Sequence, residues 1–504
     1  MFADLAKIPA AQTFARRLEA GGAQTFSGIA TSAQPFFAAL LQKLFPQRTI
    51  VIVTENLKAQ ESFQQDLETW LGESPQFYPA WEILPHEDKL PHADVISDRL
   101  QTLVSLSENS KSKTKNSKLI VTSVTALLQK TFPPGEIQER TRTFEHGSKI
   151  APLDLIEFLE EQGYEPEAQV SQRGEIALRG GIVDIFSPTS PWPVRLDFFG
   201  DELESLREFD PLTQVSRGEI TSVTLPPAGE LGILKQRQNQ KPLATLLDYL
   251  PRETVFLLCD SDSLAVHADG YEQQVPKGDA FFISWPDFLI ELNRRGNAAV
   301  EFSEEAEIDE TGLQFETLDA FRPLAERAPE PQIAEAQRRE FFQQLHRWLR
   351  QDFFVHVFCN NEGERQRFEE IWQEHGFGVE EKLVIQIGSL ARGFICDAAK
   401  IVVVTDAEIF GRYKIQRPRR QKNSHAQAAR SALDIDFTDL EEGDLVVHLQ
   451  HGIGRYRGLK MMPVGKSRHA PAGDDQPVDT NECLVVEFAP VSYTHLTLPT
   501  NREV

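Results

Sequence analysis

The chain has 504 residues, of which 40% are hydrophobic and 25% are charged, and its formal net charge is -24. This length exceeds what one hydrophobic core supports and predicts three to five domains, while the composition is typical of a folded soluble protein. The negative charge repels phosphate backbones, which excludes a protein that coats nucleic acid with its whole surface.

The cysteines and the first residues narrow the class of protein further. The four cysteines form no Cys-x-x-Cys pair, which argues against both a disulfide framework and a cysteine zinc site. Residues 1–20 contain no apolar signal-peptide core, and no apolar run reaches the roughly eighteen residues that a membrane span needs. We therefore expect a cytoplasmic protein without a membrane partner.

Residues 1–134 alternate between helical and strand patterns. Helical spacing of apolar residues predicts helices over Gln34–Phe45 and Ala59–Leu71. The β-branched runs Thr49–Thr54 and Leu119–Thr122 are typical of buried parallel strands. Strands joined by helical crossovers predict a parallel α/β domain.

Residues 135–226 follow another pattern and predict a smaller α+β domain, inserted into the first. A helix is expected over Leu153–Gln162, and turns rich in Gly and Pro separate the expected strands. The strands are Ile176–Leu178, Ile182–Phe186 and Val194–Phe199. Residues 227–330, with a strand over Val255–Cys259, complete the first domain.

Three further segments follow. Residues 331–411 predict a second, small α/β domain, with helices over Arg338–Leu349 and Glu362–His375. Residues 412–439 form a basic and helical linker, for which a solvated segment is favoured over a DNA clamp. Residues 440–490 offer short strands and turns that suit a small, incomplete β-barrel. The fold class is therefore multidomain α/β.

The loop before the first expected helix has the position and spacing of a nucleotide-binding loop but lacks the residues that bind phosphate and Mg²⁺. A working loop reads G-x-x-x-x-G-K-[ST], so that backbone amides and the lysine bind phosphates and the hydroxyl holds Mg²⁺. Here the loop begins at Gly28, and Ala33, Gln34 and Pro35 replace Gly, Lys and Ser/Thr. For this segment taken alone, an ordinary loop before a helix is the favoured interpretation. Both interpretations predict that no ATP binds here.

No segment shows a catalytic or metal-binding pattern. Residues 78–99 gather histidines and carboxylates, but Pro85 and Pro91 break the helix that could align them, so an extended surface loop that enters a helix is the favoured interpretation. No Ser-His-Asp set or paired-carboxylate context stands out. We therefore expect no catalytic residue, no metal and no cofactor in this chain.

The strand Val194–Phe199 carries an unusual outward face. Alternation places Arg195, Asp197 and Phe199 on one side, while Leu196 and Phe198 point into the core. A large aromatic residue between charges is a plausible interface anchor. A solvated face with one incidental aromatic side chain explains the same pattern.

Four long strings, found in this order, carry a resemblance. They are YPAWEILPHEDKLPHADVISDRL, ALRGGIVDIFSPTSPWPVRLDFFGDELESLREFDPLTQVS, GSLARGFICDAAKIVVVTDAEIFGR and DLVVHLQHGIGRYRGL. Together they closely resemble the N-terminal half of the bacterial transcription-repair coupling factors. The resemblance covers Met1 to about Ala489. Residues 491–504 do not fit the family pattern, so we expect a foreign tail there.

The resemblance implies a UvrB-like module that has lost its nucleotide site. It also implies an inserted domain that binds UvrA through two arginines and a phenylalanine, which fall by motif on Arg179, Arg195 and Phe199. The barrel of the family binds the β subunit of RNA polymerase. We expect an exposed strand edge near Tyr456, Leu459 and Met461 to make that contact.

The expected function is an adaptor in transcription-coupled nucleotide-excision repair, which recruits UvrA to stalled RNA polymerase. In the family, ATP, Mg²⁺ and double-stranded DNA belong to a translocase motor that this chain lacks. The alternative is a UvrB-type excision-repair ATPase, against which the replaced loop residues argue. The helix that directly follows Pro91 also leaves no room for the DNA-gripping hairpin of UvrB.

Overall fold

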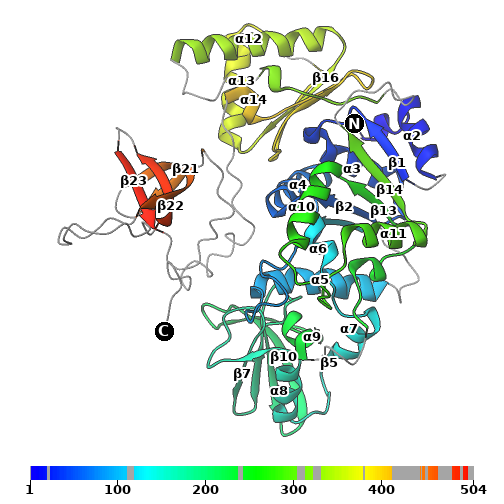
Figure 1. Ribbon diagram of the computed structural model, residues 1–504, viewed down its shortest axis with the longest axis vertical. Helices are drawn as coiled ribbons and strands as arrows, with labels where there is room; N and C mark the ends of the chain where they lie inside the picture. Colours follow the sequence, from blue (N-terminus) through cyan, green and yellow to red (C-terminus); the bar gives the residue numbers. More distant parts are fainter. Residues whose placement is uncertain are drawn as a thin grey trace, which may run out of the picture. The chain divides into compact units, whose positions relative to one another are not determined.

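Figure 1 shows the computed structural model of the chain, which divides into two compact units, Met1–Arg420 and Gln421–Val504. The structure describes residues 2–19, 23–109, 118–236, 242–303, 313–321, 331–377, 381–410, 443, 445–448, 452–463, 480–488 and 492–497.

The first domain is built on a six-stranded sheet in which every neighbouring pair of strands is parallel. The strand order is β1 (Ala23–Ser27), β14 (Ala298–Ser303), β13 (Val255–Leu258), β2 (Ile50–Thr54), β4 (Leu119–Ser123) and β3 (Gln76–Tyr78). The helices are α1 (Phe2–Leu5), α2 (Pro9–Glu19), α3 (Gln34–Leu44), α4 (Leu57–Leu71), α5 (Ala93–Asn109), α6 (Val124–Leu128), α7 (Pro134–Arg140), α9 (Leu231–Gln236), α10 (Ser261–Glu272) and α11 (Trp285–Arg295), with short 3-10 helices η1 (Thr31–Ala33) and η2 (Leu246–Tyr249).

Both faces of this sheet are buried. In β2, Ile50 and Ile52 pack into one hydrophobic cluster, while Val51 and Val53 pack into the cluster on the opposite face. A strand with two buried faces needs apolar residues at every position, which explains the unbroken IVIV run. The parallel α/β domain predicted from the sequence is confirmed.

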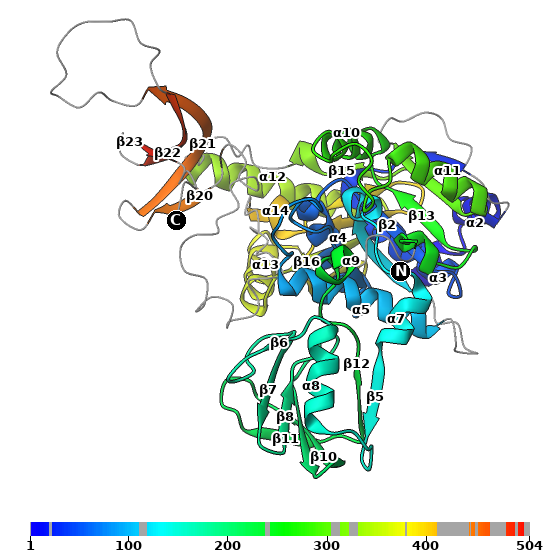
Figure 2. The same ribbon diagram turned by 60° about the horizontal axis from the view of Figure 1, so that its bottom comes forward.

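The inserted domain is a curved sheet with one helix, α8 (Pro152–Glu161), against its inner face (Figure 2). Its six strands run in the order β11 (Ser216–Glu219), β10 (Glu202–Phe209), β9 (Val194–Phe199), β8 (Ile182–Ile185), β7 (Glu175–Arg179) and β6 (Glu165–Pro166). A separate antiparallel pair, β5 (Arg142–Glu145) and β12 (Ser222–Leu225), forms a stem along which the chain enters and leaves the domain (Figure 2). Helix α7, which the sequence analysis assigned to this domain, instead buries Ile137 in the core of the first domain.

The small α/β domain contains a five-stranded mixed sheet. The strand order is β15 (Glu316–Thr317), β18 (Phe394–Cys396), β19 (Ile401–Val404), β16 (Phe354–Cys359) and β17 (Leu383–Ile387). The helices are α12 (Pro331–Arg350), α13 (Glu362–Glu374) and α14 (Asp406–Phe410), with the short 3-10 helix η3 (Asp319–Phe321). One face carries a core of its own, and the other face joins the core of the first domain through residues that include Phe358 and Val403.

Polar contacts fix this joint between the two domains. The Thr69 hydroxyl donates to the carbonyl oxygen of Ser389 over 2.7 Å, and the amide of Ala391 donates to the Asp66 carboxyl over 2.8 Å. Burial raises the pKa of Asp66 to about 8, and the hydrogen bond from Ala391 opposes that shift only in part. The carboxyl group is therefore held in its neutral form through the neutral pH range.

The second unit is an antiparallel sheet of four strands in sequence order. The strands are β20 (Leu445–His448), β21 (Gly452–Pro463), β22 (Thr480–Phe488) and β23 (Ser492–Thr497). Over the residues that the structure describes, this sheet is open, so the β-barrel expected from the sequence is not closed. The basic stretch within 412–439 lies outside the described residues.

Candidate partner-binding sites

The outer face of the inserted domain, which we define by Arg179, Ile182, Asp184, Arg195, Asp197 and Phe199, is the side of the sheet opposite α8. The strand registers place Arg179 across from Ile182, and Ile182 across from Asp197. The alternate residues, among them Leu196, pack with α8 in the core. The structure therefore brings Arg179, Arg195 and Phe199 onto one face, as the alternation indicated for Arg195 and Phe199 and as the resemblance implied for Arg179.

Phe199 is 80% exposed, the most exposed large apolar side chain among the described residues. The chain opposite it is the turn at Gly180 and Gly181, where the amide of Phe198 donates to the carbonyl oxygen of Gly181 over 2.8 Å. Gly180 has a positive φ of 66°, and a Cβ atom on Gly181 would lie 2.9 Å from the oxygen of Phe198. The turn therefore requires glycine and leaves the aromatic ring uncovered.

Arg195 is anchored by a carboxylate that the sequence analysis did not single out. Its Nε and Nη2 atoms donate to the two oxygens of Asp184 over 2.7 and 2.8 Å. The side chain of Arg195 is 18% exposed and that of Asp184 is 1% exposed. The hydrogen bonds that Arg195 donates to Asp184 raise the pKa of the guanidinium, which stays charged. A lone carboxylate within the apolar strand IVDIF was the signal that a cation lies opposite.

The guanidinium of Arg195 also lies 4.6 Å from the ring centroid of Phe209. Phe209 belongs to a small cluster with Val170, Ala177 and Phe186, which buries one end of the outer face. No local pattern in the sequence indicates this cluster, because Val170 reaches it from a loop. Arg195 is thus held from two sides, by charge and by stacking.

Arg179 is exposed, and its Nη2 and Nε atoms donate to the carbonyl oxygen of Ala168 over 2.9 and 3.3 Å. It makes no ion pair with any carboxylate of the residues that the structure describes, whereas Arg207 on β10 pairs with Asp197 on the adjacent strand β9. Arg179 therefore keeps an uncompensated positive charge at the surface.

The loop at Gly28 lies between β1 and α3, as the frame of a nucleotide-binding loop requires, but its backbone groups are engaged. The amide of Ala30 donates to the carbonyl of Phe315 over 3.0 Å, and the amide of Phe315 donates to the carbonyl of Gly28 over 2.8 Å. The amide of Ala33 donates to Ala30 over 2.8 Å, and Ala33 and Gln34 are buried. The chain's own segment around Phe315 thus covers the loop.

In the C-terminal sheet, the predicted polymerase contacts lie on β21. Tyr456 is 4% exposed, so its side chain supports the sheet and does not offer a surface contact. Strand β20 pairs with Gly452–Arg455, and the amide of Gly443 donates to the carbonyl of Tyr456. Past Arg457, that edge of β21 pairs with no strand that the structure describes. The side chains of Leu459 and Met461 lie outside the description.

Comparison with known proteins gives two domain matches. A family model described as the UvrB interaction domain matches residues 143–231, and one described as the CarD-like/TRCF RID domain matches residues 440–503. The transcription-repair-coupling factor of Haemophilus influenzae is 26% identical over 481 residues, which cover 83% of this chain and 41% of the relative. That of Bacillus subtilis is 25% identical over 516 residues, covering 88% of this chain and 42% of the relative.

The chain corresponds to the N-terminal part of the transcription-repair-coupling factors. The resemblance carried by the four strings is thereby confirmed. The chain spans about two fifths of the length of these relatives.

The end of the chain differs from the expectation of a foreign tail. The match to the CarD-like/TRCF RID domain extends to residue 503, past the boundary placed at 490. Within this segment β23 pairs with β22 in register from Ser492 with Phe488 to Thr497 with Cys483. Residues 492–497 of the matched domain therefore take part in its sheet.

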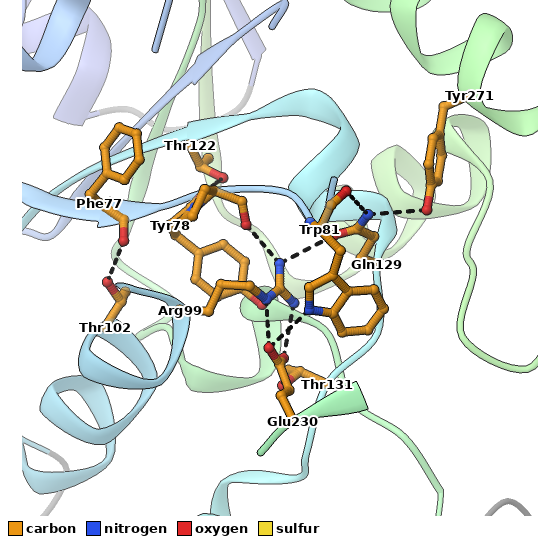
Figure 3. A network of polar contacts seen from close by, with 11 residues as sticks. Phe77, Tyr78, Trp81, Arg99, Thr102, Thr122, Gln129, Thr131, Glu230 and Tyr271 are labelled. Carbon is orange, nitrogen blue, oxygen red and sulfur yellow. Dashed lines mark hydrogen bonds and ion pairs between the residues drawn. The ribbon is translucent and has the colours of Figure 1, made fainter. Parts of the chain in front are cut away.

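A buried ion pair lies where the inserted domain returns to the first domain. Arg99 of α5 and Glu230, directly before α9, are both fully buried. The Nε and Nη2 atoms of Arg99 donate to the two oxygens of Glu230 over 2.7 and 3.0 Å (Figure 3). Glu230 also accepts from the Trp81 indole over 3.0 Å and from the Thr131 hydroxyl over 2.7 Å.

The third guanidinium nitrogen of Arg99 also donates hydrogen bonds. Its Nη1 atom donates to the carbonyl of Pro79 over 2.9 Å and to the Gln129 amide oxygen over 3.3 Å, and the guanidinium lies 4.3 Å from the ring centroid of Tyr78 (Figure 3). Burial lowers the pKa of Arg99, but the charge and hydrogen bonds of Glu230 outweigh that effect and raise it. The segment 79–92 is a loop that enters a helix, as expected, but Trp81 in the loop and Arg99 on that helix are buried and do not lie at the surface.

Within the residues that the structure describes, no helix is long and apolar enough to cross a membrane. No group of three or more His, Cys, Asp or Glu side chains in the same residues gathers where it could hold a metal ion.

Proposed function

We propose that this chain is the docking part of a transcription-coupled nucleotide-excision repair factor that acts in the cytoplasm. The inserted domain captures UvrA, and the C-terminal sheet binds the β subunit of a stalled RNA polymerase. The translocase motor, with its ATP, Mg²⁺ and double-stranded DNA, belongs to the part of the family's length that this chain does not cover.

The outer face of the inserted domain carries the UvrA proposal. Phe199 stands uncovered in it, and Arg179 and Arg195 lie on the same face. Exposed aromatic residues and arginines are the side chains that most often dominate binding energy, and guanidinium groups bind carboxylates in a bidentate manner. The match to the UvrB interaction domain over 143–231 supports a repair protein as the partner.

The UvrA contact is tested by titrating purified UvrA with the chain and its variants. Phe199→Ala and Arg179→Glu should each weaken binding by about 2 kcal/mol or more, which is a loss of about thirtyfold. Glu204→Ala, an exposed change on the neighbouring strand β10, should alter binding by a few tenths of a kcal/mol. Unchanged affinity in both Phe199→Ala and Arg179→Glu would show that this face does not bind UvrA.

The edge of β21 supports the polymerase proposal. An edge strand can extend the sheet of a partner through backbone hydrogen bonds, which tolerate varied side chains. Leu459→Arg should weaken capture of RNA polymerase in a pull-down, whereas His448→Ala on β20 should matter less. Equal capture by all three proteins would argue against this edge as the contact.

The covered loop weighs against the alternative of a UvrB-type ATPase. Phosphate binding by such a loop uses free backbone amides, and those of Ala30 and Ala33 already donate to carbonyl groups of the chain. We propose that the chain neither binds nor hydrolyses ATP. Micromolar, magnesium-dependent ATP binding in a calorimeter would contradict this.

A further inference from the structure

Ile182 is an apolar residue of the outer face to which no role has been given. It is the first residue of β8 and is 36% exposed, although β8 continues into the buried residues Val183 and Ile185. Its register partners are Arg179 on β7 and Asp197 on β9, so it lies between them in one row across the sheet. A half-exposed isoleucine between two charged residues needs an explanation that the fold alone does not supply.

Ile182 and Phe199 are diagonal neighbours on this face. Phe199 follows Asp197, the register partner of Ile182, by two residues and therefore points to the same side of the sheet. Diagonal neighbours in antiparallel strands lie about 7–8 Å apart, within reach of an aromatic ring. The residues that continue the chain past Ile182 toward Phe199 are Gly181 and Gly180, which place no side chain between the two.

The charged side chains around Ile182 and Phe199 differ in whether they are already paired within the domain. The carboxylates of Asp184 and Asp197 are bound by Arg195 and Arg207 within the domain. Arg179 is the arginine of this face that forms no ion pair with any described carboxylate. The surface is thus an apolar strip, formed by Ile182 and Phe199, with one uncompensated cation beside it.

We infer that Ile182 is a further contact residue of the UvrA-binding surface. The segment of UvrA that it meets carries an apolar side chain, which packs on Ile182 and Phe199, next to a carboxylate that pairs with Arg179. This inference rests on the proposed function, because it names the chemistry of the same interface. The strip is small, so a single apolar side chain of the partner is enough to cover it.

The test is a titration of purified UvrA with the full chain. Ile182→Thr keeps the β-branched shape that favours a strand and removes apolar surface, and it should weaken binding about tenfold. Ile182→Val removes one methylene group and should weaken binding about threefold, with no threat to folding. Ile182→Glu should weaken binding about a hundredfold, because it places a carboxylate opposite the carboxylate of the partner.

Leu153→Ala is the matched control. Leu153 is 69% exposed on α8, on the other side of the sheet, and its loss should leave the affinity for UvrA unchanged. If all three Ile182 variants bind like the parent chain while Phe199→Ala does not, the inference is wrong and the proposed function stands. If Phe199→Ala and Arg179→Glu also bind normally, the proposed interface itself is wrong.

Discussion

Glu230→Gln is the substitution that most directly tests the buried ion pair at the base of the inserted domain. It keeps the shape of the side chain and removes the counter-ion of Arg99, whose guanidinium has no access to solvent. Loss of one partner of a buried pair costs about 3–5 kcal/mol, because the other charge is left uncompensated. We expect the variant to lose free energy of unfolding in that range.

The assay is urea unfolding followed by tryptophan fluorescence, since Trp81 donates directly to Glu230. Hydrogen exchange should show the same loss of protection in α5. Glu370→Gln is the matched control: it breaks a half-exposed ion pair with Arg367 on α13, which contributes at most about 1 kcal/mol. If both variants unfold at the same urea concentration, the reasoning about burial fails.

The double variant Arg99→Met, Glu230→Met separates charge from packing. Because no unpaired charge remains, it should be less destabilised than Glu230→Gln. It should still be weaker than the parent chain, since the Trp81 indole and the Thr131 hydroxyl lose their acceptor. A double variant that is less stable than Glu230→Gln would show that shape, and not charge, dominates the site.

Three further predictions concern the first and second α/β domains. The pKa of Asp66 is about 8 in the folded chain, against an ordinary value of 3.8, so the free energy of unfolding should fall as the pH rises from about 4 to about 8 and stay level above that. Asp66→Asn should remove this fall when urea unfolding is compared at pH 5 and pH 8. An unchanged fall in the variant would contradict the prediction. Gly393→Ala should cost about 1–3 kcal/mol in thermal unfolding, because its Cβ atom would lie 2.4 Å from the oxygen of Val403, whereas Gly270→Ala, in an open helical position, should be neutral or stabilising. Restoring Gly, Lys and Thr at residues 33–35 should not restore ATP binding in a calorimeter, and micromolar binding would refute the account of the covered loop.

Local patterns in the sequence predicted the regular elements well. The run Thr49–Thr54 has no polar residue inside it, and only a strand buried on both faces accommodates such a run in a short segment. Val194–Asp197 alternates between apolar and charged residues, so the side of the sheet to which Phe199 points followed from its spacing to Arg195 and Asp197. Such features depend on neighbours along the chain and can be seen without the fold.

The buried charges could not be predicted in the same way. Arg99 and Glu230 are 131 positions apart, and nothing near either residue indicates the other. Their pairing depends on where the inserted domain begins and ends relative to α5, which is a property of the topology. The hydrogen bonds between Phe315 and the Gly28 loop could not be predicted for a similar reason, because Phe315 is far from this loop in the sequence.

The stem of the inserted domain has a mechanical consequence. Strands β5 and β12 are antiparallel partners over Arg142–Glu145 and Ser222–Leu225, and both join the first domain at the same end. A load that draws the inserted domain away from the body is therefore shared by two covalent chains side by side, which are tensioned together and are not peeled apart. A motor that pulls on a captured protein through this stem would transmit its force with little extension of the stem.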